Sequence, residues 1–314
     1  VDAVEAAASC AVKQLVLAVV GRTRPLHPSA LRVTDGSDAL FGSGSKDTRK
    51  GGRGDDVLYG GDGNDDLDGG SGKDELHGGE GDDSLYDDAG VNKLYGNAGN
   101  DSIRGSGADS IYGGTGDDTL KGGVLIDGGD GDDHATLTSQ TSTVNLGNGD
   151  NTVDGADSSQ NQNLNITTGS GNDIVRVRAY ANGLNQVAWA MRNSTLDVGA
   201  GDDRIEIKGN ALQSTIKTGD GFDAIRISGV ETDQLQIDTG ANDDVLKIDG
   251  GTRISYVSGD GSDQLQLTRN YFTSLIQSSE VKEELSQGDR LMVKEATIEE
   301  QNQVLIEPLP FAES

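Results

Sequence analysis

A single leucine recurs every nine residues between residues 51 and 86, at Leu58, Leu67, Leu76 and Leu85. Each leucine is the middle of three residues that follow a hexapeptide rich in glycine and aspartate. Successive side chains of a strand point to opposite faces, so a three-residue strand can direct this one leucine inward. The pattern therefore predicts short strands joined by polar turns, around a thin core of stacked leucines.

The turns share one consensus. Residues 51–86 read GGRGDDVLY, GGDGNDDLD, GGSGKDELH and GGEGDDSLY, which is four copies of G-G-x-G-x-D-x-U-x with U apolar. Glycines permit the positive φ and close backbone approach that a six-residue turn requires. Two such units close one coil of about 18 residues, and coils stack about 4.8 Å apart. We predict an all-β fold, a parallel β-roll or right-handed β-helix solenoid.

The nine-residue register extends beyond the regular copies, from residue 33 to residue 136. Arg49 and Ala135 take the apolar position in the units 42–50 and 128–136, and the units 105–112 and 122–127 are shortened to eight and six residues. Further downstream, G-x-G-x-D-like turns recur at 147–151, 169–173, 199–203, 219–223, 240–244 and 259–263, about one per coil. We interpret this change as a two-sided roll that gives way to a β-helix with glycine turns on one side.

These shifts in pattern suggest four segments. Residues 1–32 form a helical or disordered lead-in, 33–136 the roll, 137–267 the continuing β-helix with coils of about 20 residues, and 268–314 a C-terminal cap and tail. An insertion at 178–193 carries the only tryptophan, Trp189, which we expect to pack over a coil. A helix at 271–285 is expected to cover the last strand edge, because solenoids need capped ends.

Stacking places the sixth-position aspartates in two columns, with Asp56 over Asp74 on one side and Asp65 over Asp83 on the other. Two unit charges about 4 Å apart repel by roughly 4 kcal/mol at an effective dielectric near 20. A hard cation between the turns reverses the sign of this interaction. Ca²⁺ accepts six to eight oxygen ligands in flexible geometry, and these turns offer carboxylates and backbone carbonyls.

Composition narrows the classes of function. The 314 residues include 47 glycines, 33% hydrophobic and 4% aromatic residues, which suits a thin solenoid rather than a thick core. A formal net charge of −28 excludes electrostatic attraction to nucleic acid or anionic membranes. Such a charge also predicts a disordered chain without calcium. One cysteine, Cys10, permits no internal disulfide, and no apolar run reaches the length of a membrane-spanning helix.

The nonapeptides resemble the RTX (hemolysin-type) calcium-binding repeat family. The resemblance implies that several Ca²⁺ ions bind at the sixth-position residues. In the roll these residues are Asp38, Asp47, Asp56, Asp65, Asp74, Asp83, Asn92, Asp101, Asp109, Asp118 and Asp133; in the later turns they are Asp173, Asp203, Asp223, Asp244 and Asp263. Asn92 lacks a charge, so its site is expected to be weaker. The family also implies export from a bacterium, by type I secretion, to the cell surface or beyond.

No catalytic motif accompanies the repeats. His27, His77 and His134 do not form H-E-x-x-H, and G-x-S-x-G is absent. A regular threonine rank for ice binding is absent at the third turn position. The tyrosines at ninth positions, among them Tyr59 and Tyr95, form no aromatic rank for carbohydrate over more than a few coils. We therefore predict a non-enzymatic protein that folds on Ca²⁺ and has a structural, adhesive or stabilising role, with surface or matrix polysaccharide or protein as possible partners. The alternative is the C-terminal repeat portion of a larger secreted protease, lipase, epimerase or hemolysin.

Overall fold

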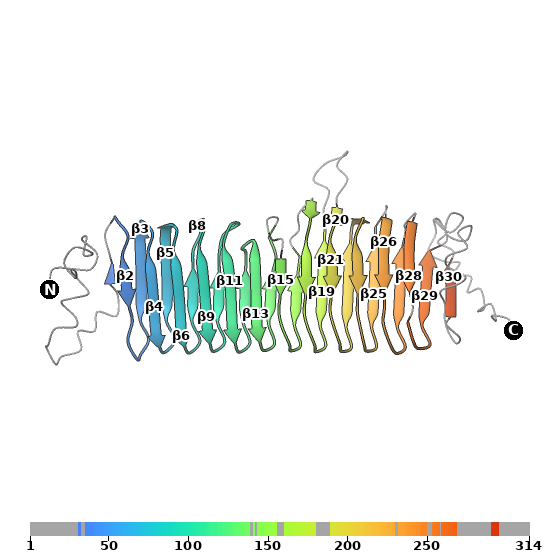
Figure 1. The fold of residues 1–314 in the computed structure, drawn as a ribbon, viewed down its shortest axis with the longest axis horizontal. Helices are drawn as coiled ribbons and strands as arrows, with labels where there is room; N and C mark the ends of the chain where they lie inside the picture. The colour runs from blue at the N-terminus through green and yellow to red at the C-terminus, as the bar shows by residue number, and fades with distance from the viewer. Residues whose placement is uncertain are drawn as a thin grey trace, which may run out of the picture. The chain divides into compact units, whose positions relative to one another are not determined.

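The strands of this chain form parallel sheets with no helix among the described residues. The computed structural model describes residues 31–32, 35–138, 141, 143–155, 160–179, 189–229, 232–249, 253–257, 259–268 and 290–294. Two compact units divide the chain, Val1–Ala135 and Thr136–Ser314. In each unit the strands alternate between two sheets as the chain coils (Figure 1). The predicted all-β parallel solenoid is therefore confirmed. The predicted helices at both ends lie outside the described residues.

In the first unit, one sheet contains β1 (Leu31–Arg32), β3 (Thr48–Arg53), β5 (Asp66–Gly72), β7 (Ser84–Tyr86), β10 (Ser102–Arg104) and β12 (Thr119–Lys121), with β8 (Ala89–Gly90) beside β5. The other sheet contains β2 (Ala39–Phe41), β4 (Val57–Asp62), β6 (Glu75–Glu80), β9 (Lys93–Ala98), β11 (Ser110–Thr115) and β13 (Leu125–Asp130). β14 (His134–Thr136) lies at the boundary of the two units. Pairing is parallel and places Leu58 against Leu76 and Leu67 against Leu85.

In the second unit, one sheet contains β16 (Thr152–Asp154), β19 (Ile174–Arg178), β22 (Arg204–Lys208), β25 (Ala224–Ser228), β27 (Val245–Asp249), β29 (Gln264–Thr268) and β30 (Arg290–Lys294). The other contains β15 (Thr143–Asn145), β18 (Asn165–Thr167), β21 (Thr195–Asp197), β24 (Thr215–Lys217), β26 (Thr232–Asp238) and β28 (Arg253–Val257). At its edge, β17 (Gln160–Gln162), β20 (Trp189–Arg192) and β23 (Asn210–Leu212) pair in turn, and β23 also pairs with β26. β30 extends the first of these sheets beyond residue 267, where the repeat pattern ends.

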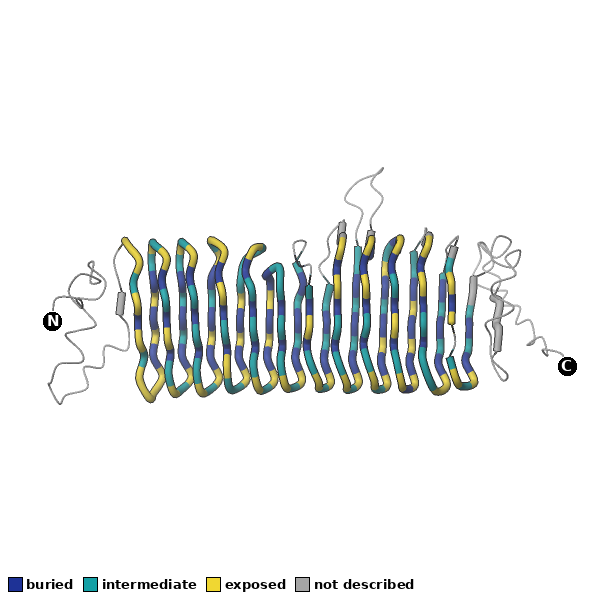
Figure 2. Tube along the Cα trace, in the orientation of Figure 1, coloured by how far each residue is buried: buried dark blue, intermediate teal, exposed yellow. Residues whose placement is uncertain are grey.

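The two units differ in the depth of their cores. A strand of the first unit buries one apolar side chain, as predicted, and Leu58, Leu67, Leu76 and Leu85 are each at most 2% exposed. The five-residue strands of the second unit bury two, for example Ile205 with Ile207 in β22. This alternation of buried and exposed positions is visible along each strand in Figure 2. The second unit therefore holds more apolar area per coil.

The exception in the first core is Arg49, which takes an apolar position and is nevertheless buried. Its Nη2 lies 3.0 Å from Asp47 Oδ1, and its guanidinium also donates to the carbonyl oxygens of Thr48 and Phe41. A buried charge is tolerated only when it is paired and hydrogen-bonded. Arg49 thus satisfies an aspartate of the turn column from inside the coil.

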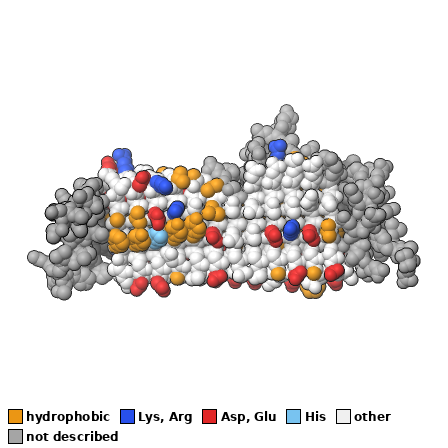
Figure 3. All heavy atoms as spheres, in the orientation of Figure 1, with side chains coloured by type: hydrophobic (Ala, Val, Ile, Leu, Met, Phe, Trp, Pro, Cys, Tyr) orange, Lys and Arg blue, Asp and Glu red, His pale blue; other side chains and the backbone are white. Residues whose placement is uncertain are grey.

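A row of aromatic rings crosses one sheet of the first unit. Phe41, Tyr59, His77, Tyr95 and Tyr112 stack in sequence, with centroids 4.7–5.0 Å apart and ring planes within 10°. The row is the band of orange spheres interrupted by a pale-blue histidine in Figure 3. It spans five coils, a longer rank than the tyrosines alone predict. Because each ring covers the face of the next, the row stabilises the sheet and leaves few ring faces open to a ligand.

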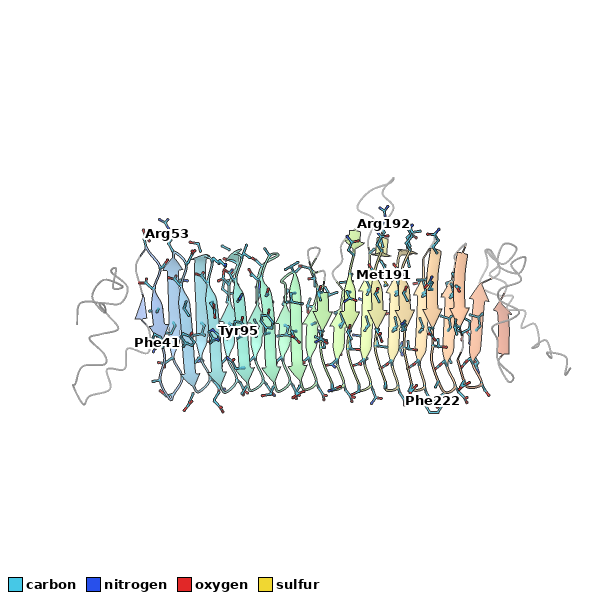
Figure 4. The ribbon with its side chains drawn as sticks, viewed as in Figure 1. Phe41, Arg53, Tyr95, Met191, Arg192 and Phe222 are labelled. Atoms are coloured by element: carbon cyan, nitrogen blue, oxygen red, sulfur yellow. The ribbon has the colours of Figure 1, made fainter. Side chains whose placement is uncertain are left out.

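Substitution of Tyr95 (Figure 4), the fourth ring of this row, by alanine removes its stacked contacts with His77 and Tyr112. Each aromatic pair contributes about 0.5–1.5 kcal/mol beyond area burial. We expect the variant to lower the free energy of unfolding of the first unit by roughly 1–3 kcal/mol in saturating calcium. Thermal melts followed by far-UV circular dichroism measure this effect. Tyr95→Phe keeps the ring and is expected to melt with the wild type; equal losses in both variants would assign the effect to the hydroxyl instead.

Candidate metal centre

The sixth-position side chains form continuous hydrogen-bonded ladders within each unit. In every case the backbone N–H of one residue donates to the Oδ1 atom of its counterpart in the following coil, at 2.7–2.9 Å. One column contains Asp38, Asp56, Asp74, Asn92 and Asp109, and the other contains Asp47, Asp65, Asp83, Asp101, Asp118 and Asp133. A third ladder, in the second unit, contains Asn151, Asp173, Asp203, Asp223, Asp244 and Asp263. The structure therefore brings together the residues that the sequence grouped.

The second carboxylate oxygen has no such donor in most turns of the first unit. Oδ2 is buried without a hydrogen-bond partner in Asp38, Asp56, Asp65, Asp74, Asp83, Asp101 and Asp118. A buried acceptor left unsatisfied costs about 1–3 kcal/mol, and more when it is charged. A row of such oxygens requires either protons or cations.

Glycine at the first turn position shapes the space around this oxygen. At Gly60 an added Cβ would lie 2.3 Å from Asp65 Oδ2 and 2.4 Å from the carbonyl oxygen of Gly78 in the following coil. The carboxylate and the carbonyl are therefore less than about 5 Å apart, a separation that one Ca²⁺ with ligands at 2.3–2.6 Å can bridge. The same arrangement recurs at Gly51, Gly78, Gly96 and Gly113.

The pKa values of these carboxylates follow from their burial. Desolvation raises the pKa of Asp83, Asp101 and Asp118 to about 7 and that of Asp56 to about 6. The N–H donor to Oδ1 lowers each value in part, and neighbouring carboxylates raise it again. Desolvation and like-charge repulsion thus both oppose the ionised form. A bound cation would favour that form.

Asn151 is the asparagine of the ladder in the second unit, and its contacts show which backbone atoms lie where an aspartate would place Oδ2. Its Oδ2 counterpart is the amide Nδ2, which donates to the carbonyl oxygens of Gly149 at 3.0 Å, Thr168 at 3.1 Å and Gly147 at 3.4 Å. In this turn a donor faces acceptors. Where aspartate occupies the same column, a carboxylate oxygen replaces that donor, and Oδ2 has no hydrogen-bond partner in Asp173, Asp203, Asp223 and Asp244.

Within the two columns of the first unit, Asp47 and Asp109 have protein donors on Oδ2. Ser43 donates to Asp47 Oδ2 through its backbone N–H at 2.6 Å and its hydroxyl at 3.1 Å. The backbone N–H of Ser106 donates to Asp109 Oδ2 at 2.5 Å. These carboxylates need a cation less than the others, and calcium at both positions stays a prediction.

Most turns of the second unit have a side chain where the first unit has glycine. The hydroxyl of Thr168 donates to the carbonyl oxygen of Val198 at 3.0 Å, and that of Thr218 to the carbonyl oxygen of Thr239 at 2.9 Å. The Thr168 hydroxyl also lowers the pKa of Asp173, although burial has the larger, opposite effect and leaves it raised to about 6. These hydroxyls thus donate to carbonyls that have no such donor in the glycine turns, while Asp173 Oδ2 and Asp223 Oδ2 remain without a hydrogen-bond partner.

Asp203 differs, because Val198 precedes it in place of threonine. Burial and the carboxylates of Asp173 and Asp223 raise the pKa of Asp203 to about 8. Calcium binding at Asp173, Asp203, Asp223, Asp244 and Asp263 stays a prediction.

A second, outer ladder was not predicted from the sequence. Fifth-position side chains accept the N–H of the following coil, in the direction opposite to the inner ladder. In the first unit Asn100 N–H donates to Asp82 Oδ1 and Asp117 N–H to Asn100 Oδ1, both at 2.9 Å. The signal that could have identified this outer ladder is the Asp or Asn that recurs at the fifth position, directly before the sixth-position aspartate.

The ligands available favour a hard cation held largely by the backbone. Among the described residues, no group of three or more His, Cys, Asp or Glu side chains is placed to hold a metal ion. Carboxylate and carbonyl oxygens suit calcium rather than the softer transition metals. His77 stacks in the aromatic row and lies 2.9 Å from Glu75 Oε1, so it belongs to the sheet surface. His27 lies outside the described residues.

Fold and turns together define a calcium-binding repeat solenoid. Residues 41–76, 68–103 and 104–124 match the RTX calcium-binding nonapeptide repeat, in four copies. These residues carry the glycine turns of the first unit. None of the described residues forms a helix with the length and hydropathy of a membrane span.

A comparison of structures shows the same fold. A hyperactive, Ca²⁺-dependent, β-helical antifreeze protein from an Antarctic bacterium, known from a crystal structure, superposes with a TM-score of 0.62. The two share 19% sequence identity, over 87% of this chain and 96% of the other. No curated protein sequence matches this chain.

Proposed function

We propose that this chain is a bacterial extracellular protein whose first unit folds by binding Ca²⁺ between its glycine turns, with a structural or adhesive role. The observation that carries the proposal is the row of buried Oδ2 atoms without donors, five of which lie beside a carbonyl oxygen of the neighbouring coil, at Asp56, Asp65, Asp83, Asp101 and Asp118. Extracellular modules bind calcium at about 10⁻⁴–10⁻³ M. Cytosolic calcium would leave such turns empty, and millimolar calcium outside the cell would fill them by mass action.

The similarity to an antifreeze protein does not extend the proposal to ice. Pairing places the third-position residues of one sheet edge in a row, from Asp62 through Glu80, Ala98 and Thr115 to Asp130. This row mixes charged, apolar and hydroxyl side chains. At 19% identity the likeness supports the fold alone.

Asp118→Asn tests the proposal with a change of two atoms. The amide keeps an Oδ1 acceptor for Asp101 N–H and, like Asn151, presents a donor to the surrounding carbonyls. We expect the variant to be more stable than the wild type by about 1–2 kcal/mol in chelator, because a buried acceptor becomes a donor. In calcium it should be less stable, because one ion loses its carboxylate.

Thermal melts with chelator, Ca²⁺ and Mg²⁺, together with calorimetric ion binding, measure both effects. Asp117→Asn removes the same charge from the adjacent outer ladder, where asparagine already occurs at Asn64 and Asn100. It is expected to change neither quantity beyond a few tenths of a kcal/mol. Equal destabilisation of Asp118→Asn in chelator and in calcium would reject a cation at this turn.

A further inference from the structure

One turn of the first unit departs from the repeat at its first, second and sixth positions, and two of these changes concern buried side chains. The turn 87–92 has Asp87 where the regular turns have their first glycine, and Asn92 where they have aspartate. Asp87 is 0% exposed, so it is buried as completely as the aspartates of the columns. The carboxylate that Asn92 lacks at the sixth turn position is thus present in Asp87, at the first turn position.

The side chain of Asp87 points toward the turn of the preceding coil. Its Oδ1 accepts the N–H of Ala89 at 3.2 Å. An added Cβ at Gly69 would lie 2.2 Å from Asp87 Oδ2 and 2.9 Å from Asp74 Oδ2. In the regular turns a backbone carbonyl fills the place of Asp87 Oδ2, as Gly78 does beside Gly60. This turn therefore presents two carboxylates to one space.

Nothing in the surrounding protein compensates the pair. No donor from the rest of the protein reaches Asp74 Oδ2 or Asp87 Oδ2, and both residues are at most 2% exposed. No ion pair among the described residues involves either one. Two buried carboxylate oxygens aimed at one space attract a hard divalent cation more strongly than one carboxylate and a carbonyl.

We propose that Asp74 and Asp87 together hold a divalent cation of the calcium type between the stacked nine-residue units 69–77 and 87–95, with Asp87 supplying the carboxylate that Asn92 lacks. The inference rests on the proposed function, because it takes the other turns as calcium sites. It differs from the sequence prediction, in which the Asn92 turn is a weak site and Asp87 has no role.

Native mass spectrometry of the full chain at graded free calcium tests this assignment, because it resolves whole numbers of bound ions. Asp87→Asn keeps the shape of the side chain and should bind one ion fewer than the wild type, or bind it at least tenfold more weakly. Asp88→Asn removes the same charge one residue away, at an exposed aspartate that accepts the Tyr86 hydroxyl. It controls for non-specific adducts and should keep the wild-type count.

A double variant tests whether a carboxylate at the sixth turn position can replace the carboxylate of Asp87. Asp87→Gly alone should lose the ion, and Asp87→Gly with Asn92→Asp, which restores the regular residues at the first and sixth turn positions, should recover the wild-type number. Hydrogen exchange of the segment 69–92 locates the change. An unchanged ion count in Asp87→Asn, or equal losses in Asp87→Asn and Asp88→Asn, would overturn this site while leaving the others. A wild-type chain that binds no calcium would instead reject the proposed function itself.

Discussion

Removal of calcium is expected to destabilise the first unit strongly and to leave the second unit protected by its hydrogen bonds. Hydrogen–deuterium exchange of the full chain, compared in millimolar calcium and in chelator, measures both units in one sample. We expect amide protection between residues 35 and 135 to fall by at least about 100-fold. An ion at 100 times its dissociation constant contributes about 2.7 kcal/mol, and several such ions approach the whole stability of an ordinary domain.

The difference between the units has an electrostatic origin. The first unit has buried aspartates on both sides of its coils, and seven of them have an Oδ2 without a donor. The second unit has one such ladder, in which Oδ2 lacks a partner in Asp173, Asp203, Asp223 and Asp244. Threonine hydroxyls at residues 168 and 218 donate to carbonyls that face this ladder. Without a cation, the buried carboxylates therefore destabilise the first unit more than the second.

The apolar cores also make the second unit more stable than the first. Strands such as β22 and β25 bury two β-branched side chains each, whereas strands of the first unit bury one leucine or isoleucine. One fully buried side chain of this size contributes about 1.5–3 kcal/mol. The second unit can therefore remain folded on apolar burial, and any ions at its turns would add to a stable structure. Equal calcium dependence of exchange in both units would contradict this account.

The pH dependence of stability is expected to reverse when calcium is removed. In metal-free buffer the folded-state pKa of Asp83, Asp101 and Asp118 is raised to about 7, above about 3.9 in the unfolded chain. The folded protein then binds more protons than the unfolded protein between about pH 4 and 7. The contribution of these groups is present in full below pH 4 and is lost as the pH rises through 7.

Thermal melts of the metal-free protein should therefore show a midpoint that falls from pH 5 to pH 8. In saturating calcium the midpoint should rise over the same range, because protons compete with the ion for the carboxylates. Buffers freed of metal on a chelating resin avoid the weak affinity of soluble chelators at low pH. Parallel pH profiles with and without calcium would show that the columns are not the sites of metal binding.

The sequence predicts the repeating part of this fold well, because each coil repeats the same pattern of turn residues and inward apolar residues. The inward leucines and both aspartate columns lie where their nine-residue register places them. The irregular spacings of 22, 30, 20, 21 and 19 residues in the second unit also match the observed ladder. A ladder depends on the order of turns, which is visible in the sequence.

The features that the sequence does not reveal depend on contacts between particular side chains. Asp87 resembles a lost glycine until its Oδ2 is seen beside that of Asp74. Arg49 resembles a break in the apolar column until its guanidinium is seen against Asp47. Phe41 and His77 complete an aromatic row although neither is a tyrosine. The partners are two residues apart for Arg49 and Asp47, 13 apart for Asp74 and Asp87, and 18 apart for the stacked rings of Phe41, Tyr59 and His77, and a consensus pattern reports each irregular residue only as a separate exception.

The inner ladders keep their geometry whatever length of chain separates two successive turns. Asp118 and Asp133 are 15 residues apart, Asp65 and Asp83 are 18 apart, and Asp173 and Asp203 are 30 apart, yet the N–H···Oδ1 distance stays between 2.7 and 2.9 Å. One edge of the coil thus sets the spacing, and the opposite edge absorbs insertions and deletions. Such a frame can gain new surface loops over evolutionary time, or by design, without losing its register.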